Sequence, residues 1–379
     1  MKKLFNTPPS LYIHLPWCSL KCPYCDFNSY TKSHRKITDE DYYNALKKEL
    51  KLKKSFFESG IQSIYIGGGT PSLFDISLLY KLLNFLRDLI GIENFPECTI
   101  ELNPESVTLD KVKTYYEMGI NRISIGGQSF NSKHLKILGR VHTSDQLFKS
   151  ITYVKKYFNN FNIDIMYGLP NQTLQDALLD LKTALTFDPP HISWYQLTIE
   201  PKTAFYKQKP KRLLPLDEII NQEKEGKIIL MEKGMHHYEI SAFSKNNYEC
   251  IHNVNYWKYG NYIGVGAGAH SKTCKIAPFK ILRSSNLNKP EKYVEQSKFL
   301  WNEIDQKEHL FEFMLNRLRL FKPIQINLII KILNIDDKNL LYKKISRLET
   351  LGLINIKSEE FWLTEFGKTH YNDVVSEFL

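Results

Sequence analysis

Short apolar runs alternate with longer amphipathic segments along the first half of the chain. The apolar runs are rich in β-branched and aromatic side chains, which is typical of buried strands. They are LYIHL (11–15), SIYIGG (63–68), CTIEL (98–102), RISIGG (122–127), FNIDIMYG (161–168) and ISWYQL (192–197). Between them, apolar residues recur at three- and four-residue spacing, which predicts helices over residues 42–57, 76–89, 109–118, 144–157 and 174–185.

A strand followed by a helix, repeated about six times, predicts parallel strands joined by right-handed crossovers. A complete eight-unit barrel typically takes about 250 residues, whereas these units fill about 200. The chain is therefore expected to be an α/β protein built on a partial, TIM-like (β/α)6 barrel. Its functional loops should follow the carboxyl ends of the strands.

The pattern changes after residue 200. It predicts a helix over 217–233, several short strands to about residue 284, and a connector over 283–303. From Glu308 the pattern is helical and ends in a hairpin at NIKSEEFWLTEFG, which is typical of a small winged-helix-like domain. We therefore expect three regions: the barrel (1–200), a barrel extension with connector (201–300), and a small helical domain (301–379).

Charge and cysteine content narrow the class of protein. The net charge of the 379 residues is +10, but Lys and Arg are spread along the chain. The helix before the hairpin carries Lys343, Lys344 and Arg347 beside Glu349, so we expect a packing role for that domain rather than nucleic-acid binding. No apolar run reaches the ~18 residues of a membrane span, and no secretory signal opens the chain. Six cysteines, three of them scattered, make no disulfide framework, which predicts a cytoplasmic protein.

The other three cysteines, Cys18, Cys22 and Cys25, fall in the loop after the first strand. Thiolates are soft ligands that suit either zinc or an iron-sulfur cluster. A structural zinc needs four ligands, and the fourth would have to be His14, on the strand itself. A cluster of four irons held by three cysteines instead leaves one iron open to an outside ligand. The residues alone allow both sites, and the spacing favours the cluster.

Polar and small residues end the following strands. Gly68, Gly69 and Thr70 close the second strand, either as a tight turn or as a place where backbone can approach a ligand without a Cβ in the way. Glu101 and Gln128 end the third and fourth strands, and Asp164 lies on the fifth. Each one alone would be read as a cap or turn former. Together, around one barrel mouth, they predict a shared ligand.

The spacing C-x3-C-x2-C resembles that of the radical S-adenosylmethionine superfamily, in which the open iron is chelated by S-adenosylmethionine. Further motifs, over nearly the whole chain, resemble the oxygen-independent coproporphyrinogen III oxidase branch of that superfamily. These are Tyr12, His14 and Pro16 before the cysteine loop, GGGTP, E-x-NPE, RIS-x-G-x-QSF, LGR-x-H and IDIMYGLP-x-QT. The resemblance implies that Cys18, Cys22 and Cys25 hold a 4Fe-4S cluster. It places around S-adenosylmethionine the residues Tyr12, Gly68, Gly69, Thr70, Glu101, Gln128, Arg140 and Asp164, with Arg140 as the partner of its carboxylate.

Two groups within this branch differ at one position after the cysteine motif. True coproporphyrinogen oxidases carry a further cysteine two residues after the third, where this chain has Phe27, and a longer N-terminal segment. In this respect the chain resembles the oxidase-like group of heme chaperones, HemW. The motif H-N-x-x-Y-W at His252, Asn253, Tyr256 and Trp257 resembles the segment proposed in that group to bind heme, with His252 as iron ligand.

Chemistry alone favours another interpretation of this motif, a hydrogen-bonded core histidine among core aromatic residues, and the resemblance reverses that preference. Cys250 is either a thiolate ligand or a buried inert cysteine. His142 and His270 receive no role.

The resemblance thus implies a cytoplasmic heme chaperone that binds heme and passes it to acceptor apoproteins, respiratory ones among them. It also implies an electron donor for the cluster and peripheral contact with membrane proteins, and no nucleic acid. The alternative is an oxidase that decarboxylates the propionate side chains of coproporphyrinogen III. A third interpretation is a nucleic-acid-binding protein that uses its basic surface. No catalytic residue is identified, and the sequence leaves open whether the chain is an enzyme.

Overall fold

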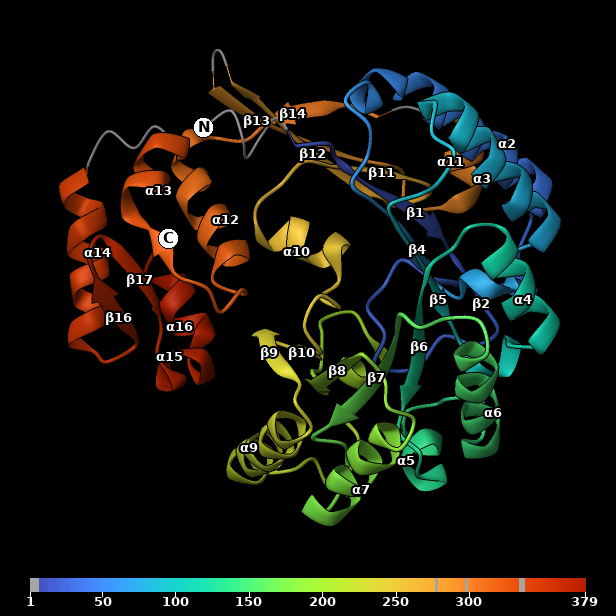
Figure 1. Ribbon diagram of the computed structural model, residues 1–379. Helices are drawn as coiled ribbons and strands as arrows, with labels where there is room; N and C mark the ends of the chain where they lie inside the picture. Colours follow the sequence, from blue (N-terminus) through green and yellow to red (C-terminus); the bar gives the residue numbers. More distant parts are fainter. Residues whose placement is uncertain (1–6, 277–278, 297–298, 334–337) are drawn as a thin grey trace.

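The structure, a computed structural model, describes residues 7–276, 279–296, 299–333 and 338–379. Within these ranges one large sheet runs through the protein (Figure 1). Its strands are β1 (Ser10–Leu15), β4 (Ser63–Gly68), β5 (Glu97–Leu102), β6 (Arg122–Gln128), β7 (Phe161–Tyr167), β8 (His191–Gln196), β9 (His236–Glu239), β10 (Ala242–Ser244), β11 (Tyr262–Val265), β12 (His270–Ile276), β13 (Phe279–Ser285) and β14 (Trp301–Glu303). Their order in the sheet is β14-β13-β12-β11-β1-β4-β5-β6-β7-β8-β10-β9.

The barrel strands predicted from the apolar runs are confirmed. β1, β4, β5, β6, β7 and β8 pair in parallel, each with the next one along the chain. The predicted helices also form between them, on the outside of the curved sheet (Figure 1). The predicted helices are α2 (Asp39–Leu52), α3 (Ile76–Ile90), α4 (Leu109–Glu117), α6 (Ser144–Lys155) and α7 (Leu174–Leu185). The short helix α5 (Ser132–Ile137) was not predicted. The fold is thus the expected partial barrel.

The start of several crossover helices is fixed by local hydrogen bonds. In α2, α6 and α7 a threonine N-cap and the third helical residue exchange hydrogen bonds, the arrangement called a capping box. The threonines are Thr38, Thr143 and Thr173. Because the cap satisfies orphan N–H groups at the helix start, the sequence itself sets where each crossover begins.

Residues after 200 extend the sheet at both edges. β9 and β10 continue it antiparallel beyond β8, and β11 pairs in parallel with β1 before β12, β13 and β14 follow antiparallel. Three further helices in this region are α8 (Ala204–Lys207), α9 (Leu216–Glu232) and α11 (Pro290–Glu295). The segment expected to be a plain connector therefore contains a helix and an edge strand, because β14 hydrogen-bonds to β13.

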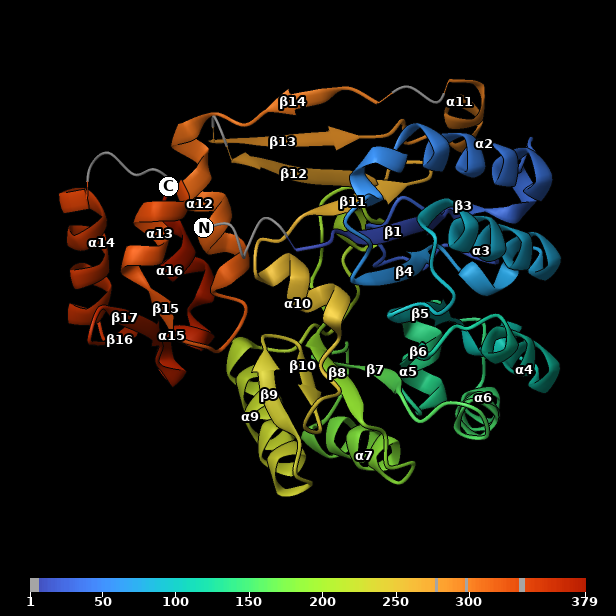
Figure 2. The ribbon, with the colours of Figure 1, turned by 45° about the horizontal axis from the view of Figure 1, so that its top comes forward.

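A helix that the apolar pattern did not predict, α10 (Ile251–Trp257), lies between the two extensions (Figure 2). The sequence indicated strands here, since seven residues are too few for a helical period to stand out. Its N-cap residue, Cys250, makes no side-chain cap. The helix is instead held by a carboxylate from β5, that of Glu97.

The C-terminal residues form a small domain with its own core beside the barrel (Figure 1). The predicted helices and hairpin are present as α12 (Gln306–Arg317), α13 (Ile326–Leu333), α14 (Lys338–Thr350), β16 (Ile354–Lys357) and β17 (Glu360–Leu363). A short strand, β15 (Ile324–Gln325), joins the hairpin, and α15 (Glu365–Thr369) and α16 (Tyr371–Ser376) complete the domain. An ion pair of 2.8 Å between Arg283 on β13 and Glu312 on α12 ties it to the sheet. Across the described ranges, no helix has both the length and the apolar character to cross a bilayer.

Candidate functional site

The cysteine loop is closed at its base by a two-strand pair. β2 (Trp17–Cys18) lies parallel to β3 (Tyr30–Thr31) and brings the two ends of the loop together. Inside the loop, the backbone N–H of Cys25 donates to the carbonyl of Cys22 at 3.1 Å. The ammonium of Lys21 bonds the carbonyls of Phe27 and Ser29 at 3.0 and 3.3 Å. All six cysteines of the chain are free thiols.

The three loop cysteines line one cavity of about 370 Å³ at the barrel mouth, which we call the cysteine cavity. The predicted ligand-binding residues from the neighbouring strand ends line it as well. They are Gly68, Gly69, Thr70, Glu101, Gln128, Arg140 and Asp164. Tyr12 is the exception among the predicted set, because it lines a second, larger cavity. The structure therefore brings together all but one of the residues that the sequence analysis placed around a shared ligand.

The thiols are positioned to act as ligands of a metal cluster. Burial raises the pKa of Cys18 and of Cys25, with smaller contributions from Cys25 and Cys22 at Cys18 and from Cys22 at Cys25. A guanidinium nitrogen of Arg140 lies 3.7 Å from the Sγ of Cys22. Three soft donors on one cavity wall, with a cation beside them, fit a thiolate-bound cluster whose charge is negative.

His14 does not complete a four-ligand zinc site with these cysteines. Its Nε2 lies 2.8 Å from the carbonyl of Asn28 and its Nδ1 lies 3.0 Å from the hydroxyl of Tyr12. Its side chain lines the larger cavity instead. Among the described residues, no three His, Cys, Asp or Glu side chains are grouped closely enough to hold a single metal ion.

The glycines after β4 allow the chain to approach its own backbone. Gly68 has φ +125°, and a Cβ there would lie 2.7 Å from the carbonyl oxygen of Leu15. A Cβ on Gly69 would lie 2.7 Å from the carbonyl oxygen of Trp17, and the N–H groups of Gly69 and Thr70 donate to the carbonyls of Leu15 and Trp17. The sequence analysis attributed these glycines to a turn or to a ligand. Their contact partner in the structure is the strand that leads into the cysteine loop.

Two carboxylates face the cysteine cavity from β5 and β7. Glu101 accepts hydrogen bonds from the hydroxyl of Tyr65 at 2.8 Å and from the N–H of Gly68 at 3.3 Å. Burial, with a smaller contribution from the charge of Asp164, raises the pKa of Glu101 to about 7. Burial also raises the pKa of Asp164, which accepts from Asn162 at 2.7 Å. A bound cation or amino group would favour the ionised form of both carboxyl groups.

Arg140 and Gln128 are held by other polar groups of the barrel. Besides Cys22, the guanidinium of Arg140 donates to Asn103 Oδ1 and to the carbonyl of Gly126, both at 2.8 Å. The hydroxyl of Tyr195 donates to Gln128 at 2.5 Å. These contacts fix both side chains at the cavity wall, and a carboxylate bound by Arg140 would use its remaining donors.

Sequence reasoning missed the polar lining of the barrel interior. It consists of Arg122, Ser124, Asn162, His191, Ser193 and Tyr195, which all line the cysteine cavity. Arg122 is 2% exposed, and its Nε has no hydrogen-bond partner in the described part of the chain. Although burial opposes its charge, Cys250 and Glu97 raise the pKa of Arg122. The available signal was polar residues at alternate positions of otherwise apolar strands.

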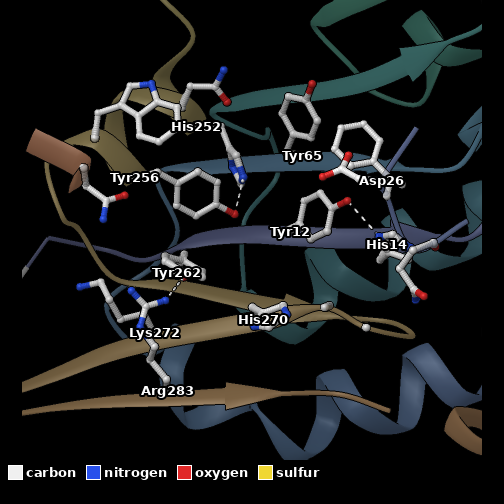
Figure 3. A pocket seen from close by; sticks show the side chains of 18 of the residues that line it. Tyr12, His14, Asp26, Tyr65, His252, Tyr256, Tyr262, His270, Lys272 and Arg283 are labelled. Carbon is white, nitrogen blue, oxygen red and sulfur yellow. Dashed lines mark hydrogen bonds between the residues drawn. The ribbon is translucent and has the colours of Figure 1, made fainter. Parts of the chain in front are cut away.

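The second cavity, of about 860 Å³, lies between α10 and strands β1, β12 and β13; we call it the aromatic cavity (Figure 3). Its walls include Tyr12, Tyr65, Tyr256, Trp257, Tyr259 and Tyr262. The rings of Tyr256 and Tyr262 meet edge to face at 4.5 Å between centroids. This volume is near the upper end of the ~300–1,000 Å³ typical of small-molecule sites.

His252 lies in the wall of the aromatic cavity and points inward from α10 (Figure 3). Its Nδ1 is 3.0 Å from the hydroxyl of Ser63, and its Nε2 is 3.1 Å from the hydroxyl of Tyr256. The side chain is 1% exposed, and burial lowers the pKa of His252 to about 3. The sequence analysis offered two interpretations, a hydrogen-bonded core histidine and a ligand-binding histidine. The structure has features of each, because His252 is hydrogen-bonded in the core and also lines a cavity. Cys250 is buried, and burial raises the pKa of its thiol to about 12.

The two cavities are neighbours that share part of their walls. The shared residues are Phe27, Tyr65, Gly68, Glu101, Asn253 and Trp257. Phe27 is 61% exposed, in contrast to the other aromatic residues of the loop. The position at which the sequence departs from the oxidases therefore lies between the cysteine cavity and the aromatic cavity.

Separate family models match the barrel and the C-terminal domain of this chain. It matches the family model of the Radical SAM superfamily over residues 12–184 and that of the HemN C-terminal domain over 304–368. It is 40% identical to the heme chaperone HemW of Buchnera aphidicola subsp. Schizaphis graminum, over 99% of this chain and 100% of that protein. Its identity to the Escherichia coli heme chaperone HemW is 36%, over 98% of both chains.

Among solved structures, the coproporphyrinogen III oxidase of Escherichia coli superposes with a TM-score of 0.83 and 19% identity. The match covers 99% of this chain and 91% of the oxidase. At this identity the superposition shows a common fold and nothing about activity.

Proposed function

Because this chain belongs to the HemW family of heme chaperones within the radical SAM superfamily, we propose that it binds heme and delivers it to acceptor apoproteins. We further propose that it carries a 4Fe-4S cluster that binds S-adenosylmethionine. One observation supports the proposal above the others. Cys18, Cys22 and Cys25 line a cavity that shares wall residues with a larger aromatic cavity.

The cysteine cavity is the proposed site of the cluster and of S-adenosylmethionine. Cys18, Cys22 and Cys25 would hold three of the irons, and the cluster would supply one-electron chemistry when it is bound. The raised pKa of Glu101 and of Asp164 suits a site whose ligand brings positive charge. Arg140 is the proposed partner of the ligand's carboxylate, as the resemblance implies, with Gly68, Gly69, Thr70 and Gln128 at the same wall.

The aromatic cavity is the proposed seat of the heme. Its tyrosines and Trp257 offer flat apolar faces to a macrocycle, and its volume is adequate for a ligand of that size. The sequence motif names His252 as the iron ligand. In the arrangement described here, its Nε2 would have to exchange the hydroxyl of Tyr256 for the iron.

Delivery of heme requires partners outside the chain. We propose acceptor apoproteins, respiratory proteins among them, and an electron donor for the cluster, with peripheral contacts to membrane proteins where the acceptors reside. We place this activity in the cytoplasm, since six free thiols suit a reducing compartment. Nucleic acid is not among the proposed partners.

The oxidase alternative is less well supported. The two heme chaperones compared above are 40% and 36% identical to this chain over nearly its full length, whereas the oxidase is 19% identical. A direct test is to incubate the reconstituted protein with coproporphyrinogen III, S-adenosylmethionine and a reductant under anaerobic conditions. Accumulation of protoporphyrinogen would overturn the chaperone assignment.

The cluster is tested by iron and sulfide analysis after anaerobic reconstitution. We expect about four irons and four sulfides per chain in the wild type, and a large loss in Cys22→Ala. Cys98→Ala is the matched control, because Cys98 is a buried thiol of β5 outside the cysteine cavity. S-adenosylmethionine should change the electron paramagnetic resonance spectrum of the reduced wild-type cluster. Wild-type iron content in Cys22→Ala would refute the proposed ligand set.

A further inference from the structure

Three histidines line the aromatic cavity, and their surroundings differ. Both ring nitrogens of His14 and both ring nitrogens of His252 have hydrogen-bond partners within the chain. His270, on β12, is exposed, and its ring has no hydrogen bond to any described residue. Figure 3 shows it on the wall formed by β12, across the cavity from His252 and Tyr256. Among these three histidines, His270 is therefore the one whose ring nitrogens have no hydrogen bond to a described residue.

We propose that His270 is the first axial ligand of the heme iron. This inference rests on the proposed function, and it names the residue at which that function begins. A metal–imidazole bond is about 2 Å long, so the iron must reach the nitrogen directly. At His252 the ring of Tyr256 stands in the way, with its centroid 4.8 Å from that of the imidazole. His270 is exposed and lines the cavity, and no described residue is hydrogen-bonded to its ring.

The chemistry around His270 suits iron coordination. An imidazole binds a metal in its neutral form. Although the residue is exposed, the cavity wall removes part of the water around its ring, and this partial burial, followed by the positive charge of Arg283, lowers the pKa of His270 and favours the neutral ring at pH 7. The strand pairing also fixes its position, since His270 lies opposite Ser285 in the ladder between β12 and β13. The ligand is thus held on a regular strand rather than on a loop.

The neighbouring residues indicate how the macrocycle would lie. Side chains two apart on a strand share one face, so Lys272 lies on the same face as His270, about 7 Å along β12. Lys272 is paired in the ladder with Arg283, and both line the aromatic cavity. Glu312 already accepts from Arg283 at 2.8 Å, and the carbonyl of Tyr259 accepts from Lys272 at 2.8 Å. The two cations at this end favour the carboxylate edge of a heme, while Tyr256 and Tyr262 contact its apolar part.

Under this arrangement His252 acts as a positioning residue. Its Nε2 bonds the hydroxyl of Tyr256 and holds that ring in the cavity wall. Substitution of His252 would therefore disturb the wall and weaken heme binding indirectly. Substitution of His270 would remove the iron ligand itself, which is a difference that spectroscopy detects.

The experiment is a heme titration of the wild type, His270→Ala, His252→Ala and His236→Ala, with the cluster spectrum of heme-free protein subtracted. His236→Ala is the control, because His236 is an exposed histidine on β9 and lines neither cavity. We expect one histidine-ligated heme per chain in the wild type and in the control. In His270→Ala we expect loss of the histidine-ligated Soret and resonance Raman signals and an affinity at least about tenfold lower. Free imidazole should restore the ligated spectrum of His270→Ala, since the site is open.

Each outcome is decisive. A wild-type spectrum and affinity in His270→Ala would overturn the inference and leave the proposed function intact. Loss of the histidine-ligated spectrum in His252→Ala but not in His270→Ala would assign the ligand to His252. Absence of heme binding in the wild type would instead overturn the proposed function. Because His270 is exposed, its substitution should leave the thermal unfolding midpoint close to that of the wild type, and this is measured alongside.

Discussion

The carboxylate of Glu97 holds the helix that carries the H-N-x-x-Y-W motif, and its removal gives the sharpest prediction. Glu97 begins β5 and is 7% exposed. One of its oxygens accepts from the backbone N–H of Ile251 and the other from that of His252, both at 2.9 Å. The thiol of Cys250 lies 3.6 Å from the same carboxylate. Because α10 has no side-chain cap of its own, Glu97 is its N-terminal anchor.

The expected effect of Glu97→Ala follows from these contacts. Each hydrogen bond to a charged acceptor contributes about 1.5–3 kcal/mol, and a buried N–H left without a partner costs a similar amount. Two such bonds predict a loss of about 3–6 kcal/mol in the free energy that keeps α10 in place. Glu97→Gln keeps one acceptor oxygen but turns an amide donor towards the second N–H, so we expect about half of that loss. The deletion also leaves Arg122 without one of its negative neighbours, which adds to the cost.

The assay is amide hydrogen exchange of residues 251–257 in the wild type, Glu97→Ala and Glu97→Gln. Protection of these amides should fall in the order wild type, Gln variant, Ala variant, and heme affinity should fall with it. Glu93→Ala is the matched control, since Glu93 is an exposed carboxylate of the same segment. The reasoning is refuted if exchange of the α10 amides in Glu97→Ala stays within about 0.5 kcal/mol of the wild type.

Two further predictions concern other carboxylates. Burial raises the pKa of Glu101 to about 7 from 4.5, so this group contributes stability below pH 4.5 that is lost as the pH rises through 7. The unfolding free energy of the wild type relative to Glu101→Gln should therefore drop by about 3 kcal/mol between pH 4.5 and pH 8 in urea titrations, and a constant difference would contradict this. Glu312 accepts from Arg283 and from the hydroxyl of Tyr259, both at 2.8 Å. Glu312→Gln should weaken the attachment of the C-terminal domain by about 1–3 kcal/mol, seen as faster limited proteolysis between β14 and α12, and an unchanged rate would argue against it.

The barrel could be predicted because the sequence patterns that define its strands and helices span only a few residues each. Strand–helix alternation is visible within a short window, and the structure reproduces most of these elements to within a few residues. The largest difference is the helix predicted over 42–57, which is α2 over Asp39–Leu52. The family assignment, made from motifs at the strand ends, is confirmed by the relatives. By contrast, α10 depends on Glu97 from a distant strand, and β14 depends on pairing with β13. Neither dependence is visible in a local window.

The part of the site that lies at strand ends could be predicted, and the part inside the barrel could not. The residues at strand ends meet in one cavity because carboxyl ends of parallel strands share an edge. The interior residues Arg122 and His191 were missed because they lie near the starts of their strands, where the sequence analysis looked for no ligand. Tyr12 was expected at the cysteine cavity; it lies beside Tyr65 in the ladder and shares that inward face, but its ring lines the aromatic cavity, where its hydroxyl bonds His14. Which of two neighbouring cavities a side chain lines depends on tertiary packing, which cannot be read from the sequence.

Phe27 gives the sequence difference between chaperone and oxidase a physical meaning. A cysteine at this position would add a soft, oxidisable ligand beside the cluster loop. A phenylalanine adds only an apolar ring, and it is 61% exposed where the cysteine cavity and the aromatic cavity share a wall. Such a ring has no affinity for iron, so it leaves the proposed cluster to Cys18, Cys22 and Cys25, and it offers an apolar contact to a macrocycle on the other side. One side chain at this boundary would therefore contact both proposed ligands.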